Sequence, residues 1–203
     1  MSPTVRASTN PRLWIVAGPN GCGKSSAYDR SDIDEAGGSV WIINPDLLTV
    51  RIRDAEGLGQ RDANLASVER IERWLDASIE AHQTIGVETV LSTGKYRRLV
   101  TKAKAFGFEV WLTYVYVASV ERQLERIGLR VAKGGHAVPE DKVRERRFRS
   151  FDQLPWFFHH ADTALLFDNS GSEPEKVADK SGGQAWIGRG LLPELRERLL
   201  AGV

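Results

Sequence analysis

Apolar and polar positions change along the chain in blocks, and these blocks predict strands and helices in alternation. Short, continuous apolar runs bounded by turn residues are typical of strands buried on both faces of a parallel sheet. Such runs are LWIVAG (13–18), SVWIINPD (39–46), GVETVLSTG (86–94), FEVWLTYVYV (108–117) and TALLFDNS (163–170). The segment QAWIG (184–188) predicts a last strand or turn.

Between these runs, apolar residues recur at helical spacing. One helix is predicted from position 64 onward, and we expect Asp62 or Asn64 to cap it. Another begins near Lys24 or Ser25. Further helices are predicted at 47–53, 95–107, 119–132, 138–161 and 191–203, with Gly107 just beyond the end of one of them.

Strands that alternate with helices predict an α/β fold with a mainly parallel sheet of five strands, flanked by helices. The length of 203 residues favours a single domain, which we assign to 13–203. Residues 1–12 are polar and carry two prolines, so we expect a loose N-terminal tail. The polar stretch at 171–183 is expected to connect the fifth strand to the last segment.

Composition narrows the function classes. The 28 Lys and Arg residues balance the 27 Asp and Glu residues to a net charge of +1, which argues against wholesale nucleic-acid binding. Cys22 is the single cysteine, so an internal disulfide is impossible. No apolar run approaches the roughly 20 residues of a membrane span. We therefore expect a soluble cytoplasmic protein without a nucleic-acid or membrane partner.

The stretch after the first strand matches the phosphate-loop pattern G-x-x-x-x-G-K-[ST], between a predicted strand and a predicted helix. Its glycines let backbone N–H groups surround phosphate oxygens, and the helix behind adds its positive end. We expect Lys24 to face solvent until it reaches the β- and γ-phosphates, and the Ser25 hydroxyl to coordinate Mg²⁺. The predicted nucleotide-binding residues are Gly18, Pro19, Asn20, Gly21, Cys22, Gly23, Lys24, Ser25 and Ser26.

A phosphate loop does not specify how the nucleotide is used. A GTPase would need a base-reading N-K-x-D, which the chain lacks. A motor usually has an acidic pair at the end of an apolar strand, and none of the predicted strands ends that way. A small kinase needs a general base for its acceptor hydroxyl and an arginine-rich lid over the transferring phosphoryl group. The sequence offers candidates for both.

Polar residues at the ends of the second and third predicted strands are candidates for the acceptor site. Asp46 is placed to act as general base, or alternatively to cap the helix that follows it. Glu88 lies in an apolar run, where it would pair with a lid arginine, help hold Mg²⁺ through water, or form a structural ion pair. Ser92 and Thr93 would either hydrogen-bond a polar substrate or stabilise the turn in which they lie.

Residues 126–150 are predicted to form the lid, because two cationic helices flank Gly134-Gly135-His136. Arginine suits phosphoryl oxygens through its fixed fork of donors, and His136 would add a hydrogen bond. The alternative is a solvated face on which the arginines pair with Glu140, Asp141 and Glu145. The arginines of this segment are Arg126, Arg130, Arg144, Arg146, Arg147 and Arg149.

These segments together resemble the zeta toxin family of P-loop kinases. GPNGCGKSS, INPD, ETVLS, RVAKGGHAVPEDKVRERRFRS and LLFDNSG occur in that order between residues 13 and 171. The resemblance implies a nucleotide-kinase-like fold and ATP- and Mg²⁺-dependent phosphorylation of the sugar 3′-hydroxyl of UDP-N-acetylglucosamine or a related UDP-sugar. It also implies toxicity through starved cell-wall synthesis, and an antitoxin protein as a partner.

The resemblance also carries roles onto individual residues. Lys24 and Ser25 match the ATP and Mg²⁺ residues, Asp46 the base and Thr93 a substrate contact. Arg130, or else Arg126, matches a phosphate-contacting lid arginine, and FDNS suggests that Asn169 lies near the adenine. The chain departs from the family where Ser92 replaces an acidic residue, a part that Glu88 would take. It departs again near His136, where the family has its second lid arginine. Arg146 or Arg149 would take the role of that arginine.

Three functions stay open from the sequence. The first is a zeta-like UDP-sugar kinase with Lys24, Asp46 and Arg130 as its catalytic residues. The second is a kinase for another small molecule, such as a different nucleotide sugar or an antibiotic hydroxyl. The third is a nucleotide-binding module whose effect comes from a partner.

Overall fold

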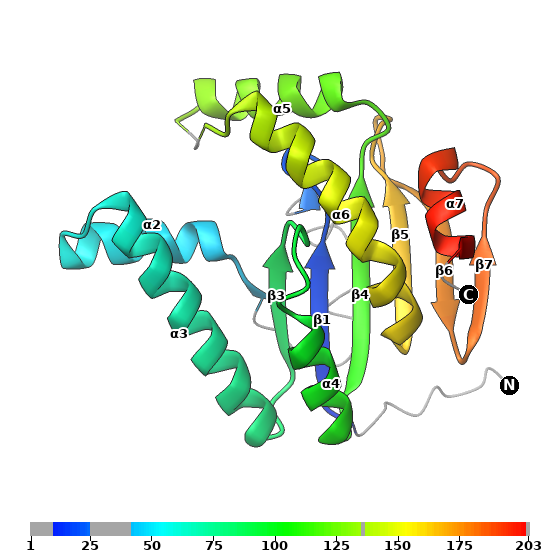
Figure 1. The fold of residues 1–203 in the computed structure, drawn as a ribbon, viewed down its shortest axis with the longest axis horizontal. Helices are drawn as coiled ribbons and strands as arrows, with labels where there is room; N and C mark the ends of the chain where they lie inside the picture. Colours follow the sequence, from blue (N-terminus) through cyan, green and yellow to red (C-terminus); the bar gives the residue numbers. More distant parts are fainter. Residues whose placement is uncertain (1–9, 25–41, 135–136, 202–203) are drawn as a thin grey trace, which may run out of the picture.

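The computed structural model describes residues 10–24, 42–134 and 137–201, and its sheet has seven strands in the order β2-β3-β1-β4-β5-β6-β7 (Figure 1). The strands are β1 (Arg12–Ala17), β2 (Ile42–Ile43), β3 (Ile85–Thr89), β4 (Glu109–Tyr116), β5 (Thr163–Asp168), β6 (Glu175–Ser181) and β7 (Gln184–Ile187). Strands β1 to β5 run parallel to one another, which confirms the α/β class and the predicted parallel strands.

The predicted total of five strands is wrong, because β6 and β7 extend the sheet as an antiparallel hairpin beside β5. β6 lies within the polar stretch at 171–183, which was predicted to be a connecting segment. Only Val177 and Ala178 of that strand are buried, so it lacks the continuous apolar run of a central strand. Gly182 and Gly183 have φ of 57° and 79°, the left-handed geometry of a tight hairpin turn.

Helices cover the sheet and one of its ends. Figure 1 shows α4, α6 and α7 in front of the sheet, and α5 across the end toward which the parallel strands point. α2 packs on α3 beside the β2 edge. The helices are α2 (Pro45–Glu56), α3 (Gln60–Glu80), α4 (Arg97–Ala105), α5 (Val120–Ala132), α6 (Glu140–His160) and α7 (Pro193–Ala201).

Several helix ends follow local sequence signals. Ser119 caps α5 by accepting a hydrogen bond from the Arg122 N–H, and Gly107, with φ of 79°, ends α4 as predicted. The predicted side-chain cap of α3 is wrong. That helix begins one turn earlier than the apolar spacing indicates, and Gly59 precedes it without a side-chain hydrogen bond.

The core lies between the central strands and the inner faces of α3, α4 and α6. β1 and β4 are almost wholly buried, as expected for central strands. The second half of α6 enters the same core through Phe151, Leu154, Phe157 and Phe158, so this helix is anchored to the sheet. Within the described ranges, no helix has the length and apolarity needed to cross a membrane.

Strand register brings several loops to one edge of the sheet, which we call the carboxyl edge because the parallel strands end there. Ala17 is level with Thr89 of β3 and with Tyr114 of β4. Ile43 is level with Val87, so Asn44 and Glu88 are neighbours. Ligands of open parallel sheets bind at this edge, where consecutive strands diverge to opposite sides of β1.

Candidate functional site

The phosphate loop (18–24) leaves β1 at the centre of the carboxyl edge. The Gly18 N–H donates to the Thr89 carbonyl at 3.2 Å, so the loop starts as an extension of the sheet. Gly18 has a φ of +145°, and a Cβ at this position would lie 2.0 Å from the Val115 carbonyl oxygen. Only glycine fits there, because the loop lies directly against β4.

Side chains from outside the loop hold two of its carbonyl groups. Gln123 of α5 donates through Nε2 to the Asn20 carbonyl at 2.7 Å, and Asn169 donates through Nδ2 to the Cys22 carbonyl at 2.8 Å. In a trans peptide the N–H points away from the carbonyl of the preceding residue. The N–H groups after Asn20 and Cys22 are therefore directed away from these side chains, as an anion-binding nest requires.

Lys24 is buried in this structure, and the expectation that it faces solvent is wrong. Its side chain is 8% exposed, and Nζ donates to the carbonyls of Gly18 and Pro19 at 2.9 and 3.3 Å. A buried ammonium needs such acceptors because desolvation is costly. To reach a phosphate, the lysine exchanges these carbonyls for phosphate oxygens.

Glu88 pairs with the phosphate loop. Its Oε1 lies 3.8 Å from Lys24 Nζ, and its Oε2 accepts a hydrogen bond from Asn44 Nδ2 at 3.0 Å. The Glu88 side chain is 13% exposed. These two contacts help to stabilise a carboxylate in this strand, and they link β3, the phosphate loop and the start of α2.

Asp46 is exposed in the first turn of α2, two residues after Asn44. The alternative that Asp46 caps this helix is wrong, because the Asn44 side chain accepts from the Asp46 and Leu47 N–H groups at 3.0 and 3.3 Å. The Asp46 carboxylate is therefore not used as the cap. Its role as base stays a prediction.

Arg126 and Asn169 meet beside the loop. Arg126 Nη2 donates to the Asn169 carbonyl at 2.8 Å, while the Asn169 amide holds Cys22. A hollow of about 490 Å³ adjoins them, between one face of α5 and residues 170–172. Polar side chains from both segments line it.

The other lid arginines differ in their surroundings. Arg130 is exposed in the last turn of α5, and Arg146 is half-buried on α6. Arg144 pairs with Glu140 at 2.7 Å and Arg149 pairs with Glu145 at 2.5 Å, both along the exposed side of α6. The last two pairs match the solvated-face alternative, whereas the phosphate-binding role stays a prediction for Arg126, Arg130 and Arg146.

The loop after β3 holds the remaining described candidates. The Thr89 hydroxyl accepts from the Leu91 N–H at 3.0 Å, and Leu91 has a φ of 57°, so the strand ends in a sharp turn. Ser92 is half-buried and Thr93 is exposed after this turn. The predictions for Ser25, Ser26 and His136 lie outside the described residues.

The site was also tested for a metal centre. In the part of the chain that the structure describes, no group of three or more His, Cys, Asp or Glu side chains could hold an ion. Glu88 supplies the one carboxylate beside Lys24 among these residues. Oxygen ligands of this kind suit Mg²⁺, which binds through few protein oxygens and mostly through phosphates and water.

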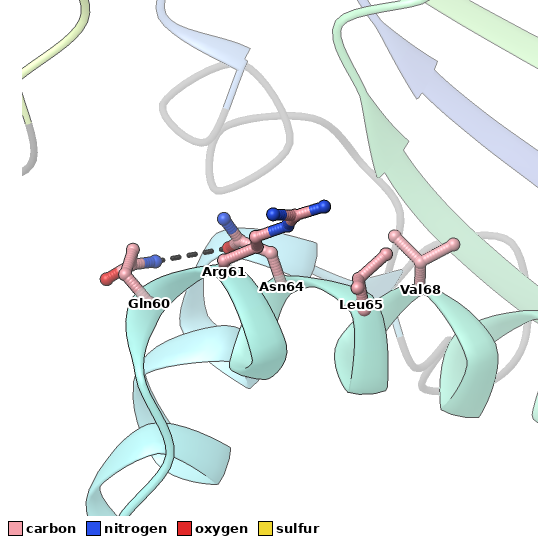
Figure 2. A pocket seen from close by; sticks show the side chains of 5 residues that line it. All are labelled: Gln60, Arg61, Asn64, Leu65 and Val68. Atoms are coloured by element: carbon pink, nitrogen blue, oxygen red, sulfur yellow. Dashed lines mark hydrogen bonds between the residues drawn. The ribbon is translucent and has the colours of Figure 1, made fainter.

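A second hollow, of about 510 Å³, lies over the first turns of α3. Its lining side chains stand on one side of the helix, as Figure 2 shows: Gln60, Arg61, Asn64, Leu65 and Val68. Ser67, in the same helix, donates to the Pro45 carbonyl at 3.2 Å and so joins this part of α3 to the residue before Asp46.

Asn44 and Gln123 are site residues that the sequence interpretation missed. Asparagine before proline and aspartate is a common start of a helix, so INPD contained the signal for Asn44. Gln123 is fully buried on the inner face of α5, one turn before Ile127. Its partner, the Asn20 carbonyl, lies 103 positions away in sequence, so nothing local indicated it.

Known proteins match both the sequence and the fold. The family model described as zeta toxin matches residues 2–161. An uncharacterized protein of Haemophilus influenzae is 30% identical over 142 residues, which are 66% of this chain and 96% of that protein.

Among solved structures, a chain of the AvrRxo1-ORF1:-ORF2 complex with ATP has a TM-score of 0.72 at 18% identity, over 94% of this chain and 63% of that one. This chain thus spans less than two thirds of that neighbour. A chain of the PezAT chromosomal toxin-antitoxin system of Streptococcus pneumoniae has a TM-score of 0.62 at 14% identity, over 97% and 85%. At these identities the likeness shows a shared fold.

Proposed function

The chain belongs to the zeta toxin family, and we propose that it is an ATP-dependent kinase that phosphorylates the sugar 3′-hydroxyl of UDP-N-acetylglucosamine or a related UDP-sugar. One observation carries the proposal. The phosphate loop, Glu88 and the start of α2 meet at the carboxyl edge, so a nucleotide on the loop would have its γ-phosphate near Asp46.

ATP is proposed to bind with its phosphates in the loop and its base in the hollow beside Arg126 and Asn169. The Asn20 and Cys22 carbonyls are held away from the anion side of the loop, which supports the binding of phosphates there. Asn20 Oδ1 is buried and makes no hydrogen bond to the described residues. A donor from bound substrate or ordered water would satisfy this atom. The neighbour solved with ATP supports this choice of nucleotide.

The proposed reaction uses Asp46 as general base. Its carboxylate takes the proton of the acceptor hydroxyl while that oxygen attacks the γ-phosphorus, and the bond to the β,γ-bridging oxygen breaks to release ADP. Lys24 and the lid arginines would stabilise the charge on the moving phosphoryl group. A bound Mg²⁺, held by the Ser25 hydroxyl, would neutralise phosphate charge.

The acceptor is proposed to lie on the α2–α3 side of the loop. Leu47, next to Asp46, is 62% exposed, and Leu65 in the α3 hollow is 57% exposed. Together with Ser92 and Thr93 after β3, they offer apolar and polar contacts to a nucleotide sugar. As a toxin, the kinase would deplete a precursor of the cell wall. An antitoxin protein would restrain it, and the PezAT neighbour comes from a toxin-antitoxin system.

The test is product analysis. The full chain is incubated with ATP, Mg²⁺ and UDP-N-acetylglucosamine, and mass spectrometry searches for ADP and a singly phosphorylated UDP-sugar. A parallel incubation with a metabolite extract identifies any other acceptor, and Lys24→Met serves as the matched control. ATP binding without any phosphorylated product in either incubation would contradict the kinase proposal and favour a nucleotide-binding module.

A further inference from the structure

A continuous chain of hydrogen bonds runs from α6 to the phosphate loop. Arg147 donates through Nη1 to Gln123 Oε1 at 2.5 Å, and Gln123 donates through Nε2 to the Asn20 carbonyl at 2.7 Å. The Gln123 side chain is 0% exposed. The chain therefore joins the two lid helices to the loop through a fully buried amide.

Arg147 determines which way the Gln123 amide faces. A glutamine side chain presents a carbonyl oxygen and an NH₂ group of nearly equal size, so packing alone does not orient it. A guanidinium only donates, and it therefore selects the oxygen. The NH₂ group is then directed to the Asn20 carbonyl, which accepts only.

Arg147 is itself held at several points. It also donates to the carbonyls of Val117 and Ala118, at 2.7 and 2.8 Å, and its guanidinium lies 4.4 Å from the centre of the Phe151 ring. These contacts fix the guanidinium between the end of β4 and α6. The sequence interpretation grouped Arg147 with lid arginines that face phosphate, but its donors point into the protein.

The loop also contacts α5 directly at Gly21. This residue has a φ of +73°, and a Cβ there would lie 2.7 Å from the Gln123 carbonyl oxygen and 2.9 Å from Ile127 Cγ1. The Asn20–Gly21 peptide therefore lies against the helix, with its carbonyl on Gln123. Because the peptide is trans, its N–H points to the opposite side.

We propose that Arg147 and Gln123 are positioning residues, which orient the Asn20–Gly21 peptide so that the loop is preformed for the phosphates of ATP. The proposal rests on the proposed use of the loop for ATP. Without the Gln123 donor, the buried Asn20 carbonyl lacks its partner and the peptide rotates to find another. The loop must then become ordered when the nucleotide binds, and this entropic cost weakens the affinity for ATP.

The test compares four single variants of the full chain with wild type. Gln123→Met removes the donor at nearly constant volume. Gln123→Glu keeps an acceptor for Arg147 but presents a carboxylate to the Asn20 carbonyl. Arg147→Met removes the orienting donor, and Arg144→Met is the control, because Arg144 lies on the same helix but pairs only at the surface.

Two readouts are needed. Hydrogen exchange of the amides at 18–24 in the ligand-free protein should be faster in the two Gln123 variants and in Arg147→Met. Their dissociation constant for ATP, measured by calorimetry, should rise about tenfold, which corresponds to one buried hydrogen bond. In a Gln123→Met background, Arg147→Met should change the dissociation constant for ATP by less than about twofold, because both residues act on the same peptide. Arg144→Met should match wild type in both readouts.

Unchanged exchange and unchanged ATP affinity in folded Gln123→Glu and Arg147→Met would overturn the positioning role. Strictly additive effects in the double variant would overturn the connected chain. Melting temperatures establish that each variant is folded, and Gln123→Glu keeps the test usable if Gln123→Met does not fold. Faster loop exchange without acceptor phosphorylation by wild type would instead support the positioning role and contradict the proposed kinase activity.

Discussion

Lys24 and Glu88 form a buried pair at the centre of the carboxyl edge, with 3.8 Å between Nζ and Oε1. One comes from the phosphate loop and the other from β3. Each charge offsets part of the cost of burying the other. Nucleotide binding would change this pair, because a phosphate competes with Glu88 for the lysine.

Replacing Lys24 should therefore affect both binding and stability. Lys24→Met should abolish ATP binding and lower the free energy of unfolding by about 1–3 kcal/mol, because Glu88 loses a partner. Calorimetry with ATP and denaturant unfolding measure the two effects. Lys24→Met combined with Glu88→Gln should regain part of the stability and none of the binding. Wild-type ATP affinity in Lys24→Met would remove this lysine from the site.

Asp46 should be required for phosphoryl transfer alone. Asp46→Asn should lower the rate of acceptor phosphorylation by about 10²–10⁴-fold and leave ATP affinity and melting temperature nearly unchanged. Stability is spared because Asn44 already caps α2. Asp54→Asn, an exposed carboxylate of the same helix, is the control. More than half of the wild-type rate in Asp46→Asn would exclude the base role.

Asn44 should contribute to stability through both of its functions. Asn44→Ala removes the cap of α2 and the donor to Glu88, and should lower the free energy of unfolding by about 2 kcal/mol. Asn44→Ser keeps a capping oxygen and loses the amide donor. Its free energy of unfolding should therefore lie between those of wild type and Asn44→Ala. Urea unfolding measures the series. Equal stabilities for Asn44→Ala and wild type would contradict the assignment.

Arg130 should act on the transition state. Arg130→Ala should depress kcat strongly and change the ATP dissociation constant little, and Arg130→Lys should restore little activity, because an ammonium lacks the bidentate fork. Steady-state kinetics on both variants, beside Arg144→Met, decide between this role and a solvated face. Full activity with a lowered melting temperature would assign Arg130 to the surface.

Cys22 should be unreactive in the folded protein. The thiol is fully buried, and this burial raises its pKa, so little thiolate forms at pH 8. Labelling with iodoacetamide, followed by mass spectrometry, should proceed at least tenfold more slowly than in urea, as expected for a thiol that reacts only after local opening. Rapid labelling of the folded protein would show that the loop opens often.

The parallel half of the fold and the phosphate loop followed from local pattern. Buried parallel strands carry continuous apolar runs, and the loop motif needs glycine at fixed spacing, so neighbouring residues contain both signals. QAWIG, predicted as a last strand or turn, contains β7, whereas β6 was missed because an antiparallel strand near the sheet edge exposes one face and lacks that signal. The cap of α3 was misplaced because Gly59 offers no side chain to recognise.

The sequence alone therefore determined the α/β class, the phosphate loop and a family resemblance, since each depends on residues close together in the chain. Tertiary structure decided which polar groups become partners. Glu88 pairs with Lys24 because β1 and β3 are adjacent in register, and Gln123 reaches the Asn20 carbonyl because α5 crosses the carboxyl edge. A buried polar group needs a hydrogen-bond partner, and the fold determines which groups are near enough to serve as that partner.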